Sequence, residues 1–249
     1  MKKAALLAVG ALLFGLAGPA FAGGLAAGAP TFSIAVSSSE DGDRLPLTPD
    51  LQQILNGTFS GTASGSTPSF SFSSDLNVGP DPFIMGSFTL ENLSGKTQIF
   101  TVSATLGTSP LPAPTYISGF FGTVEFTDTN GDASVTFASP TLASPGTVPF
   151  MTAQIDGSQV AVLGAFNEHA EGGAGISGTH GIEIFGVQTG PGVTGSIGTA
   201  FAFSITPGDT VHVPFGFTVA PEPEGLATFA IVFALFLCTF APKSASRLN

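Results

Sequence analysis

Cysteine, tryptophan and tyrosine are nearly absent from this sequence of 249 residues, which has one Cys, one Tyr and no Trp. The single cysteine, Cys238, lies near the C-terminus. The region before it therefore has no thiol pair for a disulfide and no thiolates for a metal cofactor. The fold must depend on its apolar core, for which the sequence supplies 24 Phe.

Basic residues are also scarce: six Lys and Arg stand against 17 Asp and Glu, and the formal net charge is −11. The region from Gly23 to Glu224 holds all the acidic residues but only two basic ones, Arg44 and Lys96. Binding to nucleic acid or to an anionic membrane surface requires Lys and Arg that replace counterions. The composition thus excludes nucleic acid as a partner and is typical of a soluble surface protein that repels its own copies.

The N-terminus has the pattern of an export signal. Two lysines precede an apolar stretch over residues 4–17, and Ala20 and Ala22 place small residues at the positions that a signal peptidase reads. We expect a helical signal peptide over residues 1–22, cleaved after Ala22. A flexible leader rich in Gly and Ala follows at residues 23–30.

The C-terminal region, residues 220–249, has three parts in a fixed order. They are Pro221, Glu222 and Pro223, then an apolar run from Leu226 to Ala241, then Lys243 and Arg247 as a basic end. As a helix the run covers about 24 Å, which is less than the ~30 Å of a bilayer core. It predicts a single transmembrane helix that spans only with bilayer thinning and serves as a temporary anchor. A hydrophobic helix buried in the protein is the alternative.

This order is similar to the C-terminal sorting signal of PEP-CTERM proteins, the substrates of exosortases. The resemblance implies an exported precursor that is held in the inner membrane and cut by an exosortase near Pro221, Glu222 and Pro223. It also implies a final place at the cell surface or in the extracellular matrix, in association with exopolysaccharide and biofilm. The family usually has a tight arginine cluster at the basic end, whereas Lys243 and Arg247 stand apart here. The partners implied are the exosortase, a signal peptidase, the membrane and exopolysaccharide.

The region over residues 31–219 also resembles, loosely, an exported domain of the same proteins, in segments such as 77–92, 98–102 and 128–132. This second resemblance implies a shared scaffold and no catalytic residues. Short alternating segments separated by Gly, Pro and Asn turns predict about ten strands. We therefore expect an all-β fold, an antiparallel β-sandwich of jelly-roll or immunoglobulin-like kind.

Two strand pairs are expected to form antiparallel hairpins, Phe83–Leu90 with Gln98–Leu106 and Met151–Ile155 with Gln159–Leu163. A third hairpin is expected around the Asn-Gly pair of residues 128–132, the strongest local hairpin signal in the chain.

Other segments have weaker patterns. Thr48 and Pro49 resemble a helix start, so Asp50–Leu55 is expected to be a short helix. Ser37–Arg44 is expected to be a polar loop, and the glycine-rich stretch Gly164–Gly181 a long one. Ile182–Val187, Thr199–Ile205 and Thr210–Val219 are expected to be the last strands.

Two acidic segments are candidate metal sites. Asp128, Asn130 and Asp132 alternate around a glycine like the start of a calcium loop, but no Glu closes the loop at the required spacing. A hairpin turn is therefore the favoured interpretation. The second segment contains Glu40, Asp41 and Asp43, for which a solvated turn is favoured and calcium stays the minority hypothesis.

Four further residues, His169, Glu171, His180 and Glu183, gather in or beside the glycine-rich stretch. They would suit metal binding or acid–base chemistry, but their spacing matches no helical ligand pair, so a solvated loop is favoured. His212 alternates with two valines and is expected on the polar face of a strand. The sequence contains neither a nucleophile elbow nor a phosphate-binding loop.

Three functions are consistent with the sequence. The favoured one is a non-enzymatic surface or matrix protein that an exosortase processes. The second is an extracellular module that binds carbohydrate or calcium, although the region before the tail has no Trp and one Tyr for stacking on sugars. The third is a secreted hydrolase. No cofactor is expected, apart from calcium under the second interpretation.

Overall fold

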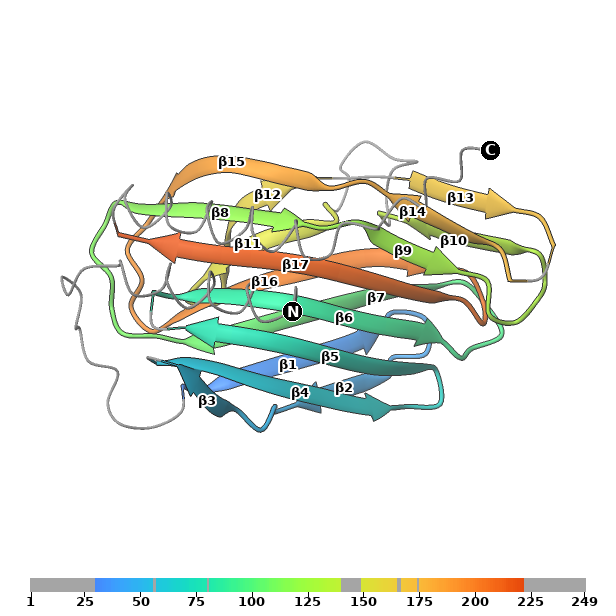
Figure 1. Ribbon diagram of the computed structural model, residues 1–249, viewed down its shortest axis with the longest axis horizontal. Helices are drawn as coiled ribbons and strands as arrows, with labels where there is room; N and C mark the ends of the chain where they lie inside the picture. Colours follow the sequence, from blue (N-terminus) through green and yellow to red (C-terminus); the bar gives the residue numbers. More distant parts are fainter. Residues whose placement is uncertain are drawn as a thin grey trace, which may run out of the picture.

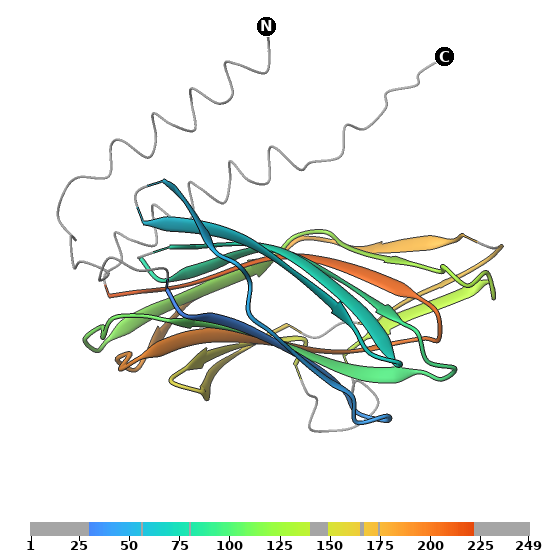
Figure 2. The same cartoon turned by 90° about the horizontal axis from the view of Figure 1, so that it is seen from below.

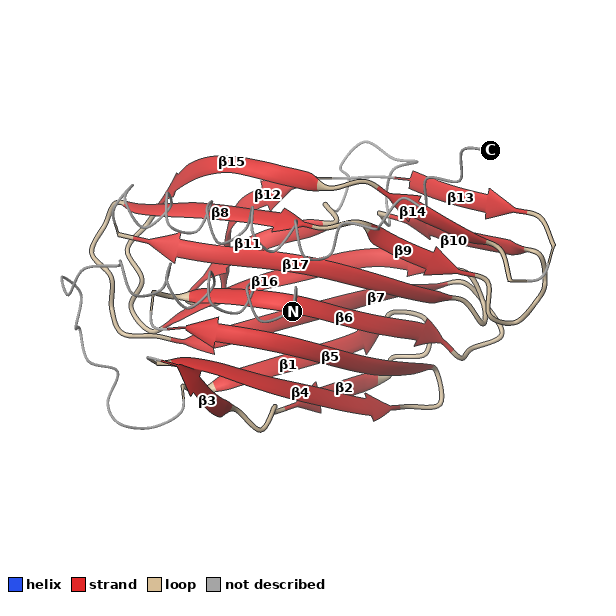
Figure 3. Ribbon diagram, in the orientation of Figure 1, coloured by secondary structure: helices blue, strands red, loops and turns tan. Residues whose placement is uncertain are grey.

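The computed structural model describes residues 30–55, 57–79, 81–139, 149–164, 167–173 and 175–221, and every regular element in these ranges is a β-strand (Figure 3). The predicted all-β class is confirmed. The predicted signal peptide, nearly all of the leader and the apolar run over residues 226–241 lie outside the described residues.

The strands form two antiparallel sheets. The first sheet has eight strands in the order β12-β11-β16-β7-β1-β2, with β10 pairing both β16 and β13. Its strands are β1 (Phe32–Ser38), β2 (Arg44–Leu47), β7 (Gln98–Gly107), β10 (Ser134–Ala138), β11 (Met151–Ile155), β12 (Ser158–Leu163), β13 (Asn167–Glu171) and β16 (Ser196–Ile205).

The second sheet has nine strands in the order β14-β9-β17-β6-β5-β4-β3, with β8 pairing both β17 and β15. Its strands are β3 (Gln52–Leu55), β4 (Thr58–Ser66), β5 (Phe70–Gly79), β6 (Phe83–Asn92), β8 (Thr115–Phe121), β9 (Val124–Thr127), β14 (Ser177–His180), β15 (Glu183–Gly190) and β17 (Thr210–Ala220). Figures 1 and 2 show the two sheets as stacked layers.

Phenylalanine fills the space between the layers. The largest fully buried side chains are all Phe. Phe88 and Phe215 from the second sheet contact Phe201 from the first, with ring centroids 5.2 and 4.8 Å apart in edge-to-face arrangements. Each fully buried Phe contributes about 1.5–3 kcal/mol of transfer free energy. The structure therefore contains the Phe-rich apolar core that was expected from a composition without a cysteine pair.

The expected hairpin of Phe83–Leu90 with Gln98–Leu106 is wrong. Both segments are strands, but β6 pairs with β5 and β17 in the second sheet, whereas β7 pairs with β1 and β16 in the first. Alternation shows that a strand has one buried face and says nothing about its partner. The connection over residues 93–97 crosses from one sheet to the other.

The Asn-Gly segment also does not form a hairpin. The strand before it, β9, pairs with β14 and β17, and the strand after it, β10, pairs with β13 and β16. The loop over residues 128–133 therefore also connects the two sheets. Its own hydrogen bonds, described below, replace the ladder that a hairpin would provide.

Three weaker expectations need correction. Asp50–Leu55 is not a helix, because Gln52–Leu55 pairs with β4 as the edge strand β3; an isolated helix of six residues is marginal in water. Gly164–Gly181 is not one long loop, since it contains β13 and β14, paired with β10 and β9. The loop expected over Ser37–Arg44 is shorter, because Ser37 and Ser38 belong to β1 and Arg44 begins β2.

Other expectations are confirmed. The hairpin of Met151–Ile155 with Gln159–Leu163 forms as β11 and β12, with Asp156 and Gly157 in the turn and a register shift between Ala153 and Gln154. The last three expected strands are β15, β16 and β17, with bounds that shift by a few residues. The number of strands was underestimated, mainly because short edge strands have little apolar alternation.

Candidate functional site

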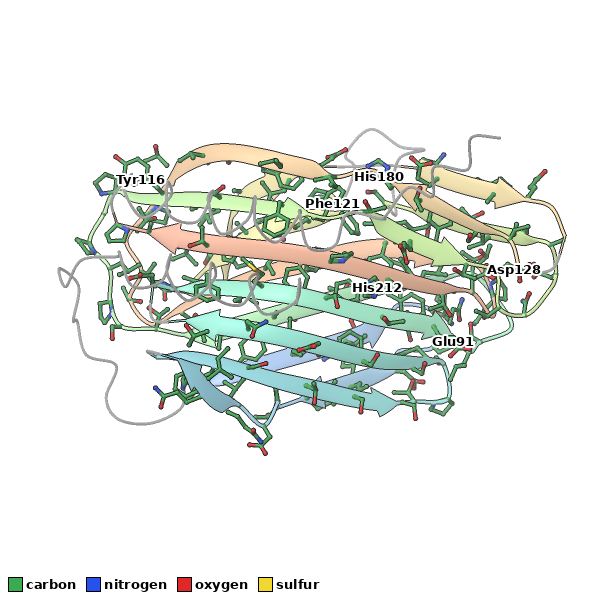
Figure 4. The ribbon with its side chains drawn as sticks, in the orientation of Figure 1. Glu91, Tyr116, Phe121, Asp128, His180 and His212 are labelled. Atoms are coloured by element: carbon green, nitrogen blue, oxygen red, sulfur yellow. The ribbon has the colours of Figure 1, made fainter. Side chains whose placement is uncertain are left out.

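Carboxylates gather at one end of the sandwich. Five loops meet there, over residues 39–43, 67–69, 93–97, 128–133 and 206–209, and we call this the acidic end. Figure 4 shows Asp128 and the nearby Glu91 at this end and Tyr116 at the opposite one. Two separate clusters of carboxylates occur at the acidic end.

The first cluster consists of Asp41 and Asp43, which have close partners. Asp41 forms an ion pair of 3.1 Å with Lys96 and accepts hydrogen bonds from Ser69 and Gln98. Asp43 accepts hydrogen bonds from the Ser69 hydroxyl at 2.7 Å and the Ser69 amide at 3.2 Å. These contacts hold the pKa of both carboxyls below the ordinary value, chiefly through Lys96 for Asp41 and Ser69 for Asp43. Glu40 donates its backbone amide to Gln98.

The second cluster is built on the loop over residues 128–133. Asp128 is 2% exposed, and its two carboxylate oxygens accept the amides of Gly131 at 2.7 Å and Ala133 at 2.9 Å. Asp132 is exposed and accepts the amide of Ser134 at 3.0 Å. Gly131 has a φ of +76°, a conformation that glycine adopts without strain.

Asp209 completes the second cluster from a distant part of the chain. Thr210 pairs with Thr127 in the ladder between β17 and β9, so Asp209 stands opposite Asp128, one step beyond the paired residues. Val211 and Phe126, the next residues of the same parity, are buried in the core. The carboxylates of Asp128 and Asp209 therefore occupy facing positions on the core side of the sheet.

Asp209 is fully buried, and neither of its carboxylate oxygens has a hydrogen-bond partner among the described residues. The Thr206 hydroxyl, whose oxygen accepts the Thr136 amide at 2.7 Å, and the Thr129 amide lie near enough to lower the pKa of Asp209, although neither meets hydrogen-bond geometry with its carboxylate. Burial dominates, and together with the charges of Asp132 and Asp128 it raises the pKa of Asp209 to about 6.

Direct hydrogen bonds fix the two loops of this cluster against each other. Asn130 donates its side-chain amide to the Pro207 carbonyl at 2.7 Å, and the Thr129 hydroxyl donates to the Gly208 carbonyl. Gly208 has a φ of +72°, and a Cβ there would come within 2.6 Å of Asn130. Only glycine fits between the two loops at this position.

Asn92 connects the two clusters. Its buried side chain donates to the carbonyls of Ile205 at 2.9 Å, Thr206 at 3.1 Å and Lys96 at 3.0 Å. The loop that carries Lys96, the partner of Asp41, is thus fixed to the turn that carries Asp209. The Asn92 amide also donates to the Asp209 carbonyl at 2.9 Å.

His180 makes a different arrangement at the side of the sandwich. Its Nδ1 lies 2.8 Å from Glu168 and its Nε2 lies 3.1 Å from Glu183. These three residues belong to β14, β13 and β15, so the ring joins a strand of the first sheet to two strands of the second. Figure 4 shows His180 beside Phe121, with ring centroids 5.7 Å apart. The contacts suit a structural connection between sheet edges.

The predicted group of His169, Glu171, His180 and Glu183 is therefore only partly brought together. His180 and Glu183 meet, but His169 contacts Glu171 at 2.9 Å and Thr136 at 2.6 Å on a separate patch. His212 lies on the outer face of β17, as expected, and contacts Thr89. Burial lowers the pKa of His212, while Glu125 opposes this shift.

Sequence reasoning missed Glu168 and Asp209. Nothing in the sequence marks Glu168 as a functional candidate, because the glycine-rich stretch around it predicts a loop and not a strand. Asp209 does have a signal in the sequence, since it shares the parity of Val211 and Val213 and so falls on the core face of its strand. Within the described ranges, no three acidic or histidine side chains already converge on one point suited to a metal ion.

The residues predicted for export and sorting lie at the edge of the described part or outside it. Pro221 follows directly on β17, whereas Ala20, Ala22, Glu222, Pro223, Lys243 and Arg247 are outside the described residues. Among the elements that the structure describes, no helix has the length and apolar character needed to cross a membrane. The sequence matches no family model and no curated protein.

Proposed function

We propose that this chain is an exported, non-enzymatic surface or matrix protein that an exosortase processes near Pro221, Glu222 and Pro223. The observation that carries the proposal is the order of these residues, the apolar run and the basic end. The resemblance to PEP-CTERM sorting signals supports processing of the precursor and association with exopolysaccharide.

The position of the motif relative to the fold supports the same proposal. The last strand, β17, ends at Ala220, where Ala220 still pairs with Tyr116 of β8. Pro221 comes next, and it has no amide hydrogen to donate to a further ladder. A cut after this point would leave every strand of both sheets intact.

The described body suits a scaffold for display. Its core consists of Phe and aliphatic residues, and its described part contains no cysteine. For the finer fold class we propose the jelly-roll alternative. Loops 93–97, 128–133 and 206–209 pass between the sheets as jelly-roll connections do, and the strands outnumber those of an immunoglobulin domain.

Intact-mass measurement of the protein from its native cells tests the proposal. We expect a mature form that has lost residues 1–22 and the segment from the Pro-Glu-Pro motif onward. Deletion of the exosortase in parallel should restore the longer C-terminus. A mature form that still carries Cys238 in cells with the enzyme would contradict the proposal.

A further inference from the structure

The turn at residues 206–209 and the loop at residues 128–133 together have the features of a cation site. The buried residues Asp128 and Asp209 both lie on the core side of the sheet, one residue beyond the paired ends of β9 and β17. Asp132, which is exposed, lies on the solvent side of the same loop. Three acidic side chains from two loops thus share one small region.

No basic side chain compensates these charges. The described part of the chain contains two basic residues, Arg44 and Lys96, and the ion pair that Lys96 makes is with Asp41 of the first cluster. Protein amides satisfy Asp128, but the two oxygens of Asp209 are buried and have no hydrogen-bond partner in the described residues. A buried ionised carboxylate normally is paired or coordinates a metal.

We propose that Asp209, Asp128 and Asp132 bind a calcium ion at the acidic end of the sandwich. Asp209 supplies the carboxylate that the loop over residues 128–132 lacks in its own sequence. The site is a binding site that neither the sorting motif nor the scaffold function requires, so the proposal stands independently of the proposed function.

Calcium fits this set of ligands better than other cations. Every donor in the cluster is an oxygen, without the imidazole or thiolate that zinc prefers. The carboxylates come from two loops and from both buried and exposed positions, an irregular arrangement that calcium tolerates and magnesium does not. Asp132 now accepts the amide of Ser134 and the side-chain amide of Asn130, so ion binding requires Asp132 to leave these donors and rotate toward Asp209.

Calcium titration of the full chain, purified in a non-ionic detergent and dialysed against EDTA, tests the site. We expect one ion to bind, with a Kd within the range of about 10⁻⁴ to 10⁻³ M found in extracellular modules. Calcium at tenfold above this Kd should raise the melting temperature by about 3–6 °C. Magnesium should give a clearly smaller shift.

Two variants and a matched control locate the ion. Asp209→Asn and Asp128→Asn should each abolish the calcium-dependent shift. Asp156→Asn is the control, because Asp156 also accepts backbone amides in a turn, those of Thr194, Gly195 and Ser196, but at the opposite end. It should retain the full shift.

The result that overturns the proposal is a wild-type protein whose melting temperature and titration heat do not respond to millimolar calcium. An equal calcium shift in Asp209→Asn, or an equal shift with magnesium, would overturn it as well. If Asp128→Asn fails to fold, Asp132→Asn replaces it, because the exposed Asp132 is the rotating ligand. Failure here would leave C-terminal processing, measured by intact mass, unaffected.

Discussion

The two carboxylate clusters at the acidic end lie on neighbouring loops, but they differ in how partner groups compensate their negative charge. Asp41 and Asp43 are surrounded by Lys96, Ser69 and Gln98. Asp209 is buried without such partners, opposite Asp128. The pKa of the first pair is lowered, whereas that of Asp209 is raised to about 6. The comparison shows that carboxylate density alone does not identify a metal site, since the first cluster is satisfied by the protein itself.

Substitution of Asn92 should have the largest effect on stability, because Asn92 connects both clusters. Asn92→Ala removes hydrogen bonds to the carbonyls of Ile205, Thr206 and Lys96, and it leaves buried acceptors without a donor. We expect the free energy of unfolding to fall by about 2–4 kcal/mol. Urea denaturation measures it, and Asn77→Ala, on the outer side of β5, is the matched control with little effect. Equal losses in the two variants would contradict the connecting role.

Replacing one carboxylate by an amide should change the stability in opposite directions in the two clusters. In EDTA at pH 7, Asp209→Asn removes a buried charge that has no partner, so it should stabilise the protein by about 1–2 kcal/mol. Asp43→Asn weakens the contacts with Ser69 and should lower the melting temperature. Thermal melting of both variants beside the wild type checks the prediction. Shifts of the same sign would remove the distinction between the clusters.

The two clusters should also make the stability of the protein depend on pH in opposite ways, because their pKa values are shifted in opposite directions. The pKa of Asp209 is raised to about 6, above the ~3.9 of an unfolded chain. The folded protein therefore holds this proton more tightly than the unfolded chain does. The contribution of Asp209 to the stability of the metal-free protein falls as pH rises from about 4 to 6. The lowered pKa values of Asp41 and Asp43 act in reverse, because their contribution is present above about pH 4 and is lost below it.

Melting curves in EDTA from pH 3 to 8 separate these contributions. The advantage of Asp209→Asn over the wild type should grow between about pH 4 and 6 and stay constant above that range. An advantage that is independent of pH would argue that the substitution acts through packing alone.

Substitution of Ser69 should have the smallest effect on stability. Its hydroxyl donates to both Asp41, at 3.0 Å, and Asp43, at 2.7 Å. Ser69→Ala should destabilise the protein by about 1 kcal/mol, because the two carboxylates retain other partners. The calcium-dependent shift should not change. A loss of that shift in Ser69→Ala would mean that the ion binds at the first cluster instead.

The sequence predicted the class of fold better than its connections. Alternation located β6, β7, β11 and β12, because each has one buried face. It did not show that β6 and β7 belong to different sheets, since the pattern contains no information about the partner strand. Edge strands such as β3 and β13 were missed because neither alternates between apolar and polar residues: β13 is mostly polar, and β3 has two Gln followed by two apolar residues.

The candidate site was half predicted. The loop of Asp128, Asn130 and Asp132 was recognised from local spacing, whereas Asp209 lies far away in sequence and joins it only through the pairing of β9 with β17. Its parity with Val211 marked it as a core-facing carboxylate. That signal becomes meaningful only when the opposite residue is known.

The most direct test of the account is a crystal structure of the protein grown with calcium chloride. We expect an anomalous difference peak in contact with the carboxylates of Asp209 and Asp128, with Asp132 turned toward it. A peak at Asp41 and Asp43 instead, or an Asp209 carboxylate that contacts only water, would contradict the account.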